Sequence, residues 1–190
     1  MAHDEQWEFC EYVKKKFPNH FLNSRVLDIG AYDVNGNEKY LFDDSCEFIG
    51  LDIGPGPGVD VICPAQEYDE PDESFDTIIS CECWEHNPYY EESILNAIRM
   101  LKKGGLFIFT CATTGRPVHG VASLEEYNKK KYENWKTLPN VIRKDWDNNY
   151  YKNVTEEDIR LAVDIEKVFH EHEFQVNLDH CDLYFWGIKK

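Results

Sequence analysis

The stretch Val26-Leu-Asp-Ile-Gly30 decides the fold of this chain. A short apolar run that ends at a glycine is typical of a buried strand followed by a sharp turn. Helical periodicity follows further along the chain and ends at Gly104-Gly105. Strands that alternate with helices predict an α/β fold, in which a mostly parallel sheet has helices on both faces. The four other predicted strands of this part of the chain are 47–51, 59–62, 75–79 and 106–110.

The two ends of the chain add further elements. Residues 4–17 have the apolar spacing of one amphipathic helix, which ends before Pro18. Thr155-x-x-Asp158 is a capping box, and it predicts a helix whose inner face extends to Phe169. Two strands at 174–178 and 183–188 follow, and the connection between them is too short for a parallel crossover. The sheet is therefore expected to close with an antiparallel hairpin.

The composition is that of a soluble protein of one domain. The 190 residues include 20 Lys and Arg against 36 Asp and Glu, which gives a net charge of −16. A field of that sign repels polyphosphate, so a nucleic-acid partner is disfavoured. The 7 cysteines form no CxxC pair, which suggests free thiols in the cytoplasm. No run resembles a membrane span or a signal peptide. The sequence predicts one cytoplasmic domain, residues 1–190, without a membrane partner.

Acidic residues at two neighbouring strand ends predict a ligand site. In parallel sheets, ligands bind at the carboxyl ends of the strands. Asp28 stands just before the Gly30 turn, and Asp52 ends the next strand, where an acid can accept hydrogen bonds from both hydroxyls of a ribose. The G-x-G-x-x-G pattern of dinucleotide-binding folds is missing, and Asp33 in the loop opposes a phosphate. A cationic or zwitterionic ligand without phosphate is expected, and an NAD-dependent enzyme is disfavoured.

Five ordered motifs resemble a known family. They cover residues 26–30, 48–52, 74–80, 85–86 and 101–106. Their order and spacing, over roughly residues 22–112, are similar to those of class I S-adenosylmethionine-dependent methyltransferases. The closing helix and hairpin fit the same fold. The resemblance implies a Rossmann-like seven-stranded sheet whose last strand is antiparallel, and S-adenosyl-L-methionine as the cofactor.

The resemblance also implies which residues hold the cofactor. Asp28 and Gly30 would lie against its methionine part, and Asp52 would hold the ribose. The turn at 65–66 would face the adenine, and the residues after the fourth strand would line the floor near the sulfonium. The implied cofactor-binding set is Asp28, Gly30, Ala31, Tyr32, Asp52, Ile53, Ala65, Gln66, Cys81 and Glu82.

Two places depart from the family pattern. Tyr32 and Val34 replace the usual second and third glycines of the first loop, with Gly36 further on, so the path of this loop is left open. Pro64 stands where the family often has an acid that contacts the adenine amino group, and Gln66 is expected to supply that contact instead.

The segment Glu82-Cys-Trp-Glu85-His86 carries the candidate chemistry. An E-x-x-E-H pattern places its acids and its histidine on one face of a helical turn, and His119 follows the fifth strand. Two carboxylates and two imidazoles suit a six-coordinate Mg²⁺ or Mn²⁺. The pattern is similar to metal-dependent O-methyltransferases that act on catechol-like quinone precursors or on the terminal ribose of small RNAs. In relatives that bind no metal, Glu-His is structural. In that case His119 is the expected general base, and the catalytic candidates are His119 and Glu82.

Residues 112–153 are expected to form a substrate lid. Within them, residues 129–152 contain seven Lys and Arg against three Asp and Glu, with five aromatic residues interleaved. This mixture suits an anionic or aromatic small molecule, or a short single-stranded nucleic acid. A lid that packs its aromatic rings on the domain and keeps its lysines in water has the same composition.

The leading hypothesis is therefore an S-adenosylmethionine-dependent methyltransferase that methylates an oxygen of a small molecule. An RNA or nucleotide methyltransferase is the first alternative, favoured by the local basic stretch and opposed by the overall charge. A non-catalytic protein that binds S-adenosylmethionine is the second.

Overall fold

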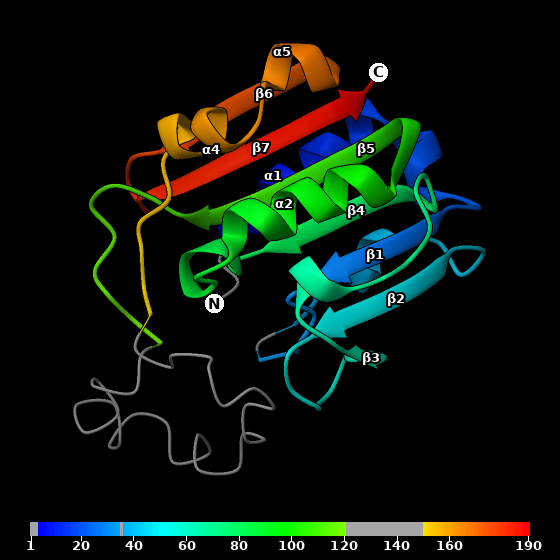
Figure 1. The fold of residues 1–190 in the computed structure, drawn as a ribbon, viewed down its shortest axis with the longest axis horizontal. Coiled ribbons are helices and arrows are strands. Elements are labelled where there is room, and N and C mark those ends of the chain that lie inside the picture. The colour runs from blue at the N-terminus through cyan, green and yellow to red at the C-terminus, as the bar shows by residue number, and fades with distance from the viewer. Residues whose placement is uncertain (1–3, 35, 121–149) are drawn as a thin grey trace.

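The computed structural model describes residues 4–34, 36–120 and 150–190, and their core is one seven-stranded sheet (Figure 1). The strand order is β3-β2-β1-β4-β5-β7-β6. β1 to β5 pair in parallel, and β7 is antiparallel to both of its neighbours. The predicted fold, including the antiparallel last strand, is confirmed. The strands are β1 (Arg25–Ile29), β2 (Glu47–Asp52), β3 (Val61–Ile62), β4 (Phe75–Cys81), β5 (Leu101–Ala112), β6 (Phe169–Asn177) and β7 (Asp182–Lys189).

Helices cover both faces of the sheet. The reason is that apolar side chains point alternately to one face and the other along a strand such as β5. In β5, Phe107 and Phe109 face the core under α2 (Tyr90–Met100), α4 (Glu156–Ala162) and α5 (Ile165–Val168). The alternate residues Leu106 and Ile108 face the core under α1 (Asp4–Lys16). Figure 1 shows α2, α4 and α5 in front of the sheet and α1 behind it. A strand with apolar side chains on both faces needs a layer on each side.

The alternation of strands and helices fails in one half of the sheet. Among the described residues, the connection from β1 to β2 contains only the short 3₁₀ turn η2 (Glu38–Leu41), and the connection from β3 to β4 contains only η3 (Ala65–Glu67). Glycine, proline and short polar residues, which favour turns over helices, are frequent in these connections. The loops at this end of the sheet are therefore free to form a ligand site.

Two predicted helix ends also differ from the structure. The predicted single helix through Phe169 is two helices, because Asp164 accepts a hydrogen bond from the backbone N–H of Lys167 and starts α5 anew. Phe169 itself begins β6. The helix expected to end at Gly104-Gly105 ends at Met100, since Leu101 already pairs with Phe75. The pairing then shifts, and Leu106 is opposite Thr77, so that 102–105 form a bulge.

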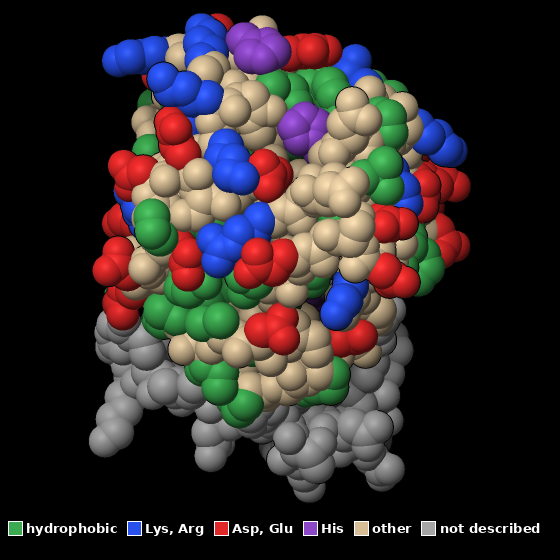
Figure 2. All heavy atoms as spheres, turned by 90° about the vertical axis from the view of Figure 1, so that its right-hand side faces the viewer, with side chains coloured by type: hydrophobic (Ala, Val, Ile, Leu, Met, Phe, Trp, Pro, Cys, Tyr) green, Lys and Arg blue, Asp and Glu red, His purple; other side chains and the backbone are tan. Residues whose placement is uncertain are grey.

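The right-hand side of Figure 1 faces the viewer in Figure 2, and basic and acidic side chains are interspersed there. At the amino ends of the parallel strands, Arg25 pairs with Glu70 (3.0 Å) and Lys102 pairs with Asp76 (2.7 Å). Pairs of opposite sign leave no single-sign field over these residues. Among the described helices, none has both the length and the apolar character required to span a bilayer.

Candidate cofactor pocket and cation site

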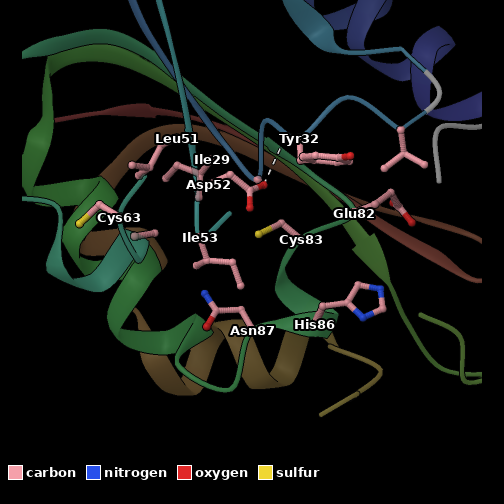
Figure 3. A pocket seen from close by; sticks show the side chains of 13 residues that line it. Ile29, Tyr32, Leu51, Asp52, Ile53, Cys63, Glu82, Cys83, His86 and Asn87 are labelled. Atoms are coloured by element: carbon pink, nitrogen blue, oxygen red, sulfur yellow. Dashed lines mark hydrogen bonds between the residues drawn. The ribbon is translucent and has the colours of Figure 1, made fainter. Parts of the chain in front are cut away.

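A cavity of about 240 Å³ opens at the carboxyl ends of β1, β2 and β4 (Figure 3). This is where parallel sheets bind ligands. Its walls combine apolar side chains with a few polar groups, which is typical of cofactor sites. The lining residues are Ile29, Gly30, Tyr32, Val34, Leu51, Asp52, Ile53, Cys63, Ala65, Glu82, Cys83, His86 and Asn87.

Asp52 is fixed in the wall by two backbone hydrogen bonds. Its Oδ2 accepts from the N–H of Tyr32 (3.1 Å), and its Oδ1 accepts from the N–H of Gly54 (3.2 Å). Burial raises the pKa of this carboxyl, which these hydrogen bonds oppose. Six of the ten residues predicted to bind the cofactor line the cavity, namely Gly30, Tyr32, Asp52, Ile53, Ala65 and Glu82.

The other four predicted residues lie outside the lining. Ala31 is buried, and its N–H donates to the carbonyl of Leu51 (3.1 Å). Gln66 accepts a hydrogen bond from the hydroxyl of Ser93 (3.2 Å) through its side-chain oxygen. The roles of these two residues remain predictions.

Cys81 and Asp28 lie behind the pocket on the side of α1. The sulfur of Cys81 is 4.0 Å from that of Cys10. Asp28 is 1% exposed, and its Oδ2 has no hydrogen-bond partner among the described residues. Burial raises the pKa of Asp28 well above its usual range, and the neighbouring carboxyl of Glu38 raises it further. An acid in this environment resists ionisation unless a positive charge comes close.

Gly30 could not be another residue. Its φ is +85°, and a Cβ atom there would lie 2.8 Å from the Cβ of Cys83. The glycine therefore serves both the turn and a close approach between the loops after β1 and β4. Cys83 lines the cavity, although it is absent from the predicted cofactor-binding set.

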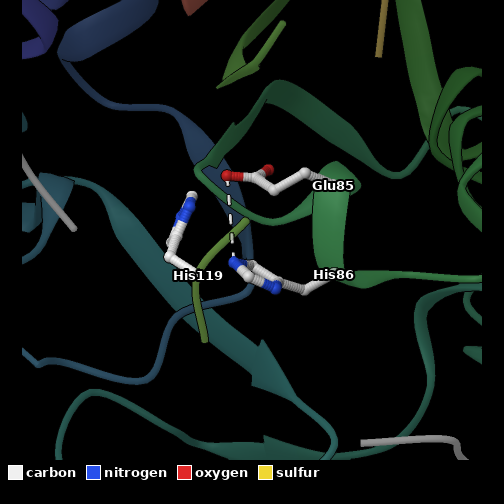
Figure 4. A group of neighbouring side chains, drawn as sticks. All are labelled: Glu85, His86 and His119. Carbon is white, nitrogen blue, oxygen red and sulfur yellow. Dashed lines mark ion pairs between the residues drawn. The ribbon is translucent and has the colours of Figure 1, made fainter. Parts of the chain in front are cut away.

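A second group of residues lies next to this pocket, where Glu85, His86 and His119 come together (Figure 4). One ligand atom from each lies within 4.8 Å of the others. Glu85 is fully buried, and both of its carboxylate oxygens lack a hydrogen-bond partner among the described residues. His86 Nε2 is 4.0 Å from Glu85 Oε1.

Burial disfavours the charged form of both imidazoles. Burial, with the nearby His119 as a smaller cause, lowers the pKa of His86 to about 3. Burial also lowers the pKa of His119. His119 Nδ1 is 3.0 Å from the carbonyl oxygen of Pro117, which assigns the ring proton to Nδ1. Nε2 of His119 is then a lone-pair donor, and it is buried without a partner among the described residues.

Glu85 completes this group with an acid that resists ionisation. Burial raises the pKa of Glu85 well above its usual range, and the charge of Glu82 adds to the effect. A buried carboxyl facing two neutral imidazole nitrogens is a donor set that fits a divalent metal ion.

Glu82, the fourth predicted ligand, does not belong to this group of three. It follows β4 with a left-handed backbone (φ 52°), and its Oε1 accepts from the hydroxyl of Thr110 (3.0 Å). Burial raises its pKa to about 7, and the charge of Asp182 contributes. Asp182 begins β7, is fully buried and accepts from Arg116 (3.2 Å). Sequence reasoning missed Asp182, because only the closing hairpin brings it to this end of the sheet.

The predicted lid is described only in part. Residues 121–149 lie outside the described residues, and with them most of the basic and aromatic stretch. Tyr150, Tyr151 and Lys152 are described, and the backbone N–H of Lys152 donates to the carbonyl of Glu85 (2.9 Å). The end of the predicted lid segment is therefore attached to the group of Glu85.

Solved structures with the same fold are similar over nearly the whole chain. One is a Burkholderia thailandensis 1,6-didemethyltoxoflavin-N1-methyltransferase with bound 1,6-didemethyltoxoflavin and S-adenosylhomocysteine (14% identity, 96% of this chain and 77% of that one, TM-score 0.62). A second is phosphoethanolamine N-methyltransferase 2 of Haemonchus contortus with S-adenosyl-L-methionine (15%, 96% and 52%, TM-score 0.62). A third is the PH0226 protein of Pyrococcus horikoshii (17%, 98% and 90%, TM-score 0.61). This chain thus spans about half of the Haemonchus enzyme.

Among the curated proteins, none matches this chain. The family model of the methyltransferase domain matches residues 1–177, which is most of the chain. The sheet order, the pocket at the strand ends and this match agree with one another. The chain belongs to the methyltransferase-domain family, as its resemblance to class I S-adenosylmethionine-dependent methyltransferases indicated.

Proposed function

We propose that this chain transfers a methyl group from S-adenosylmethionine to an oxygen atom of a small-molecule acceptor, and that Glu85, His86 and His119 bind a divalent cation beside the cofactor pocket. Family membership supports the reaction class. The cavity at the strand ends and the buried group next to it support the two binding sites.

In the proposed reaction, the chain holds the cofactor and aligns the acceptor atom with its methyl group. Each oxygen of Asp52 accepts one backbone N–H, which leaves lone pairs for ribose hydroxyls. Gly30 lets the backbone approach the ligand, and apolar walls such as Leu51 and Ile53 exclude water. When bound, S-adenosylmethionine supplies an electrophilic methyl group on a positive sulfur. Alignment of an acceptor atom with that methyl, in a dry pocket, is the larger part of catalysis in such a displacement.

The observation that carries the cation site is the environment of Glu85. A buried carboxylate without a partner costs several kcal/mol, so proteins neutralise it with a proton, a basic side chain or a metal ion. The side chains grouped with Glu85 are two imidazoles whose pKa values are lowered by burial, so they offer lone pairs rather than positive charge. A divalent cation is the ligand that satisfies all three groups together.

The donor set favours Mn²⁺ over Mg²⁺. Mg²⁺ prefers oxygen ligands, whereas two imidazole nitrogens and one carboxylate suit Mn²⁺ and later first-row ions. When bound, such a cation lowers the pKa of a coordinated hydroxyl, which is the chemistry that methylation of oxygen needs. Glu82 lines the cofactor cavity nearby and is the proposed residue for holding the released proton.

The acceptor is proposed as a small molecule that is anionic or aromatic. Two structural neighbours are N-methyltransferases named for small molecules, 1,6-didemethyltoxoflavin and phosphoethanolamine. The charge of −16 opposes an RNA acceptor. We also retain as proposals one domain over residues 1–190, a substrate lid at 112–153 and a cytoplasmic location.

Calorimetry followed by methyl transfer tests the proposal. We expect S-adenosylhomocysteine to bind and NAD not to bind. We expect transfer of labelled methyl to catechol-type hydroxyls to require Mn²⁺, and transfer to amines or to a short RNA to be absent. Transfer to an amine without metal would contradict the proposed methylation of oxygen. It would still agree with membership of the methyltransferase-domain family. Binding of the cofactor product without transfer to any acceptor would indicate a non-catalytic protein.

A further inference from the structure

The ring of Tyr151 lies against both histidines of the proposed cation site. Its centroid is 5.4 Å from that of His86 and 5.0 Å from that of His119, with interplanar angles of 63° and 66°. The two imidazoles are themselves 5.0 Å apart at 86°. Each ring thus presents an edge to the next, which is the arrangement that aromatic quadrupoles favour.

The segment around Tyr151 is fastened to the loops that carry the three candidate ligands. The N–H of Lys152 donates to the carbonyl of Glu85 (2.9 Å). The side-chain amide of Asn153 donates to the carbonyl of Arg116 (3.0 Å), in the loop that carries His119. The Tyr151 hydroxyl donates to Asn153 Oδ1 (2.8 Å), so the ring is held at both ends. Two separate loops and one tyrosine are therefore tied into one unit.

The imidazole of His119 has few other restraints. In the described part of the chain, its one hydrogen bond runs from Nδ1 to the carbonyl of Pro117, within its own loop. That contact selects the tautomer but does not connect the ring to Glu85. His86 is restrained on another side by Gly120, where a Cβ atom would lie 2.7 Å from the imidazole Cε1. Among the described residues, Tyr151 supplies the aromatic ring that contacts both imidazoles.

We propose that Tyr151 is a positioning residue of this site, whose ring holds His86 and His119 with their free nitrogens toward the carboxyl of Glu85. The proposal rests on the proposed function for the cation, and on the geometry alone for the orientation of the rings. Residues that orient metal ligands from behind typically change metal affinity 10- to 100-fold when removed. The Tyr151 hydroxyl is engaged by Asn153, so the aromatic ring, not the hydroxyl, is the active part.

The experiment compares Tyr151→Phe, which keeps the ring, with Tyr151→Ala, which removes it. Tyr150→Ala is the matched control, because it removes a neighbouring half-buried tyrosine that makes no ring contact with either imidazole in the described chain. Binding of Mn²⁺ to the full chain is measured by calorimetry. We expect affinity within about twofold of wild type for Tyr151→Phe and Tyr150→Ala, and a loss of at least about tenfold for Tyr151→Ala.

A second measurement needs no metal. Long-range ¹H–¹⁵N spectra of the imidazoles report which nitrogen carries the proton, with His119→Gln identifying the signals of His119. Wild type and Tyr151→Phe are expected to show the Nδ1-protonated form. In Tyr151→Ala the imidazole of His119 can turn away from the carbonyl of Pro117, so a mixture of both tautomers is expected. If Tyr151→Ala does not fold, Tyr151→Leu replaces it in both measurements.

The two measurements separate the two proposals. In one outcome, wild type binds no Mn²⁺ but shows the fixed tautomer, and Tyr151→Ala loses that tautomer. This outcome would overturn the cation site and support the positioning role. Tyr151→Ala with wild-type Mn²⁺ affinity and an unchanged tautomer would overturn the positioning role and leave the cation site intact.

Discussion

Gly56 lies directly against the ring of Tyr32, so closely that a Cβ atom on Gly56 would be 1.9 Å from Cε2 of the tyrosine. Tyr32 belongs to the loop after β1, where a glycine was expected from the family pattern, and Gly56 belongs to the facing loop after β2. The N–H of Asp33 also donates to the carbonyl of Pro57 (2.9 Å), which joins these loops. The glycine that allows the two loops to approach is therefore Gly56, in the loop after β2, and not a residue of the loop after β1.

Gly56→Ala is expected to weaken the binding of S-adenosylhomocysteine by about tenfold, since the added methyl group must displace a ring that lines the cavity. The backbone of Gly56 has no positive φ, so the effect comes from the contact. Calorimetry on Gly56→Ala, Tyr32→Ala and the double variant measures it. The double variant is expected to lose less affinity than the sum of the single variants, because Tyr32→Ala makes room for the methyl group. Additive losses would show that the two residues are not coupled.

Asp52→Asn is expected to reduce affinity for S-adenosylhomocysteine by about 10- to 100-fold, which corresponds to about 1.5–3 kcal/mol for hydrogen bonds to a charged group. Asp60→Asn is the matched control. Asp60 also accepts from a backbone N–H, that of Gly50 (2.8 Å), but it does not line the cavity. Asp60→Asn is therefore expected to lower stability without changing affinity. An equal loss of affinity in both variants would mean that Asp52 acts only through the loop structure.

Local sequence signals predicted the strand ends around the cavity. The apolar runs that end in Gly30 and Asp52 lie at the strand ends as expected, because short buried strands and their turns are encoded locally. The helix break at Asp164 was missed, since the apolar spacing continues through it while the aspartate side chain caps a new helix.

Contacts between distant segments could not be predicted in this way. Asp182 meets Arg116 only because β7 pairs with the end of β5. Cys83 packs against Gly30, and Gly56 packs against Tyr32. A single sequence gives no signal that these residues are in contact. The E-x-x-E-H pattern predicted Glu82, Glu85 and His86 on one face, and His119 was expected to join them from the loop after the fifth strand. The left-handed backbone at Glu82 instead separates it from Glu85, so that three residues come together.

Asp158 is expected to stabilise the protein in a pH-dependent way. Burial alone would raise its pKa, but hydrogen bonds from Lys152 and Thr155 bring it below the usual value. A lowered pKa in the folded state means stability that is present above the unfolded pKa, about 3.9, and lost as pH falls below it. Asp158→Asn should therefore cost about 1–2 kcal/mol at pH 7 and progressively less below about pH 4.

Urea unfolding of wild type and Asp158→Asn at several pH values checks this expectation. Glu157→Gln is the control, because Glu157 is an exposed acid on the same first turn of α4. A difference between wild type and Asp158→Asn that stays constant down to pH 3 would show that the charge of Asp158 contributes nothing.

Glu85→Gln is expected to separate stability from cation binding. In the absence of metal, the variant should be at least as stable as wild type, because an amide replaces a fully buried carboxyl that has no hydrogen-bond partner in the described residues. A ligand at 100 times its Kd stabilises the folded state by about 2.7 kcal/mol, so saturating Mn²⁺ should raise the Tm of wild type by several degrees. Glu85→Gln should lose that rise, whereas Glu92→Gln, which changes an exposed acid on α2, should keep it. Thermal unfolding with and without Mn²⁺ measures both effects, and an equal rise in Tm for wild type and Glu85→Gln would place the cation elsewhere.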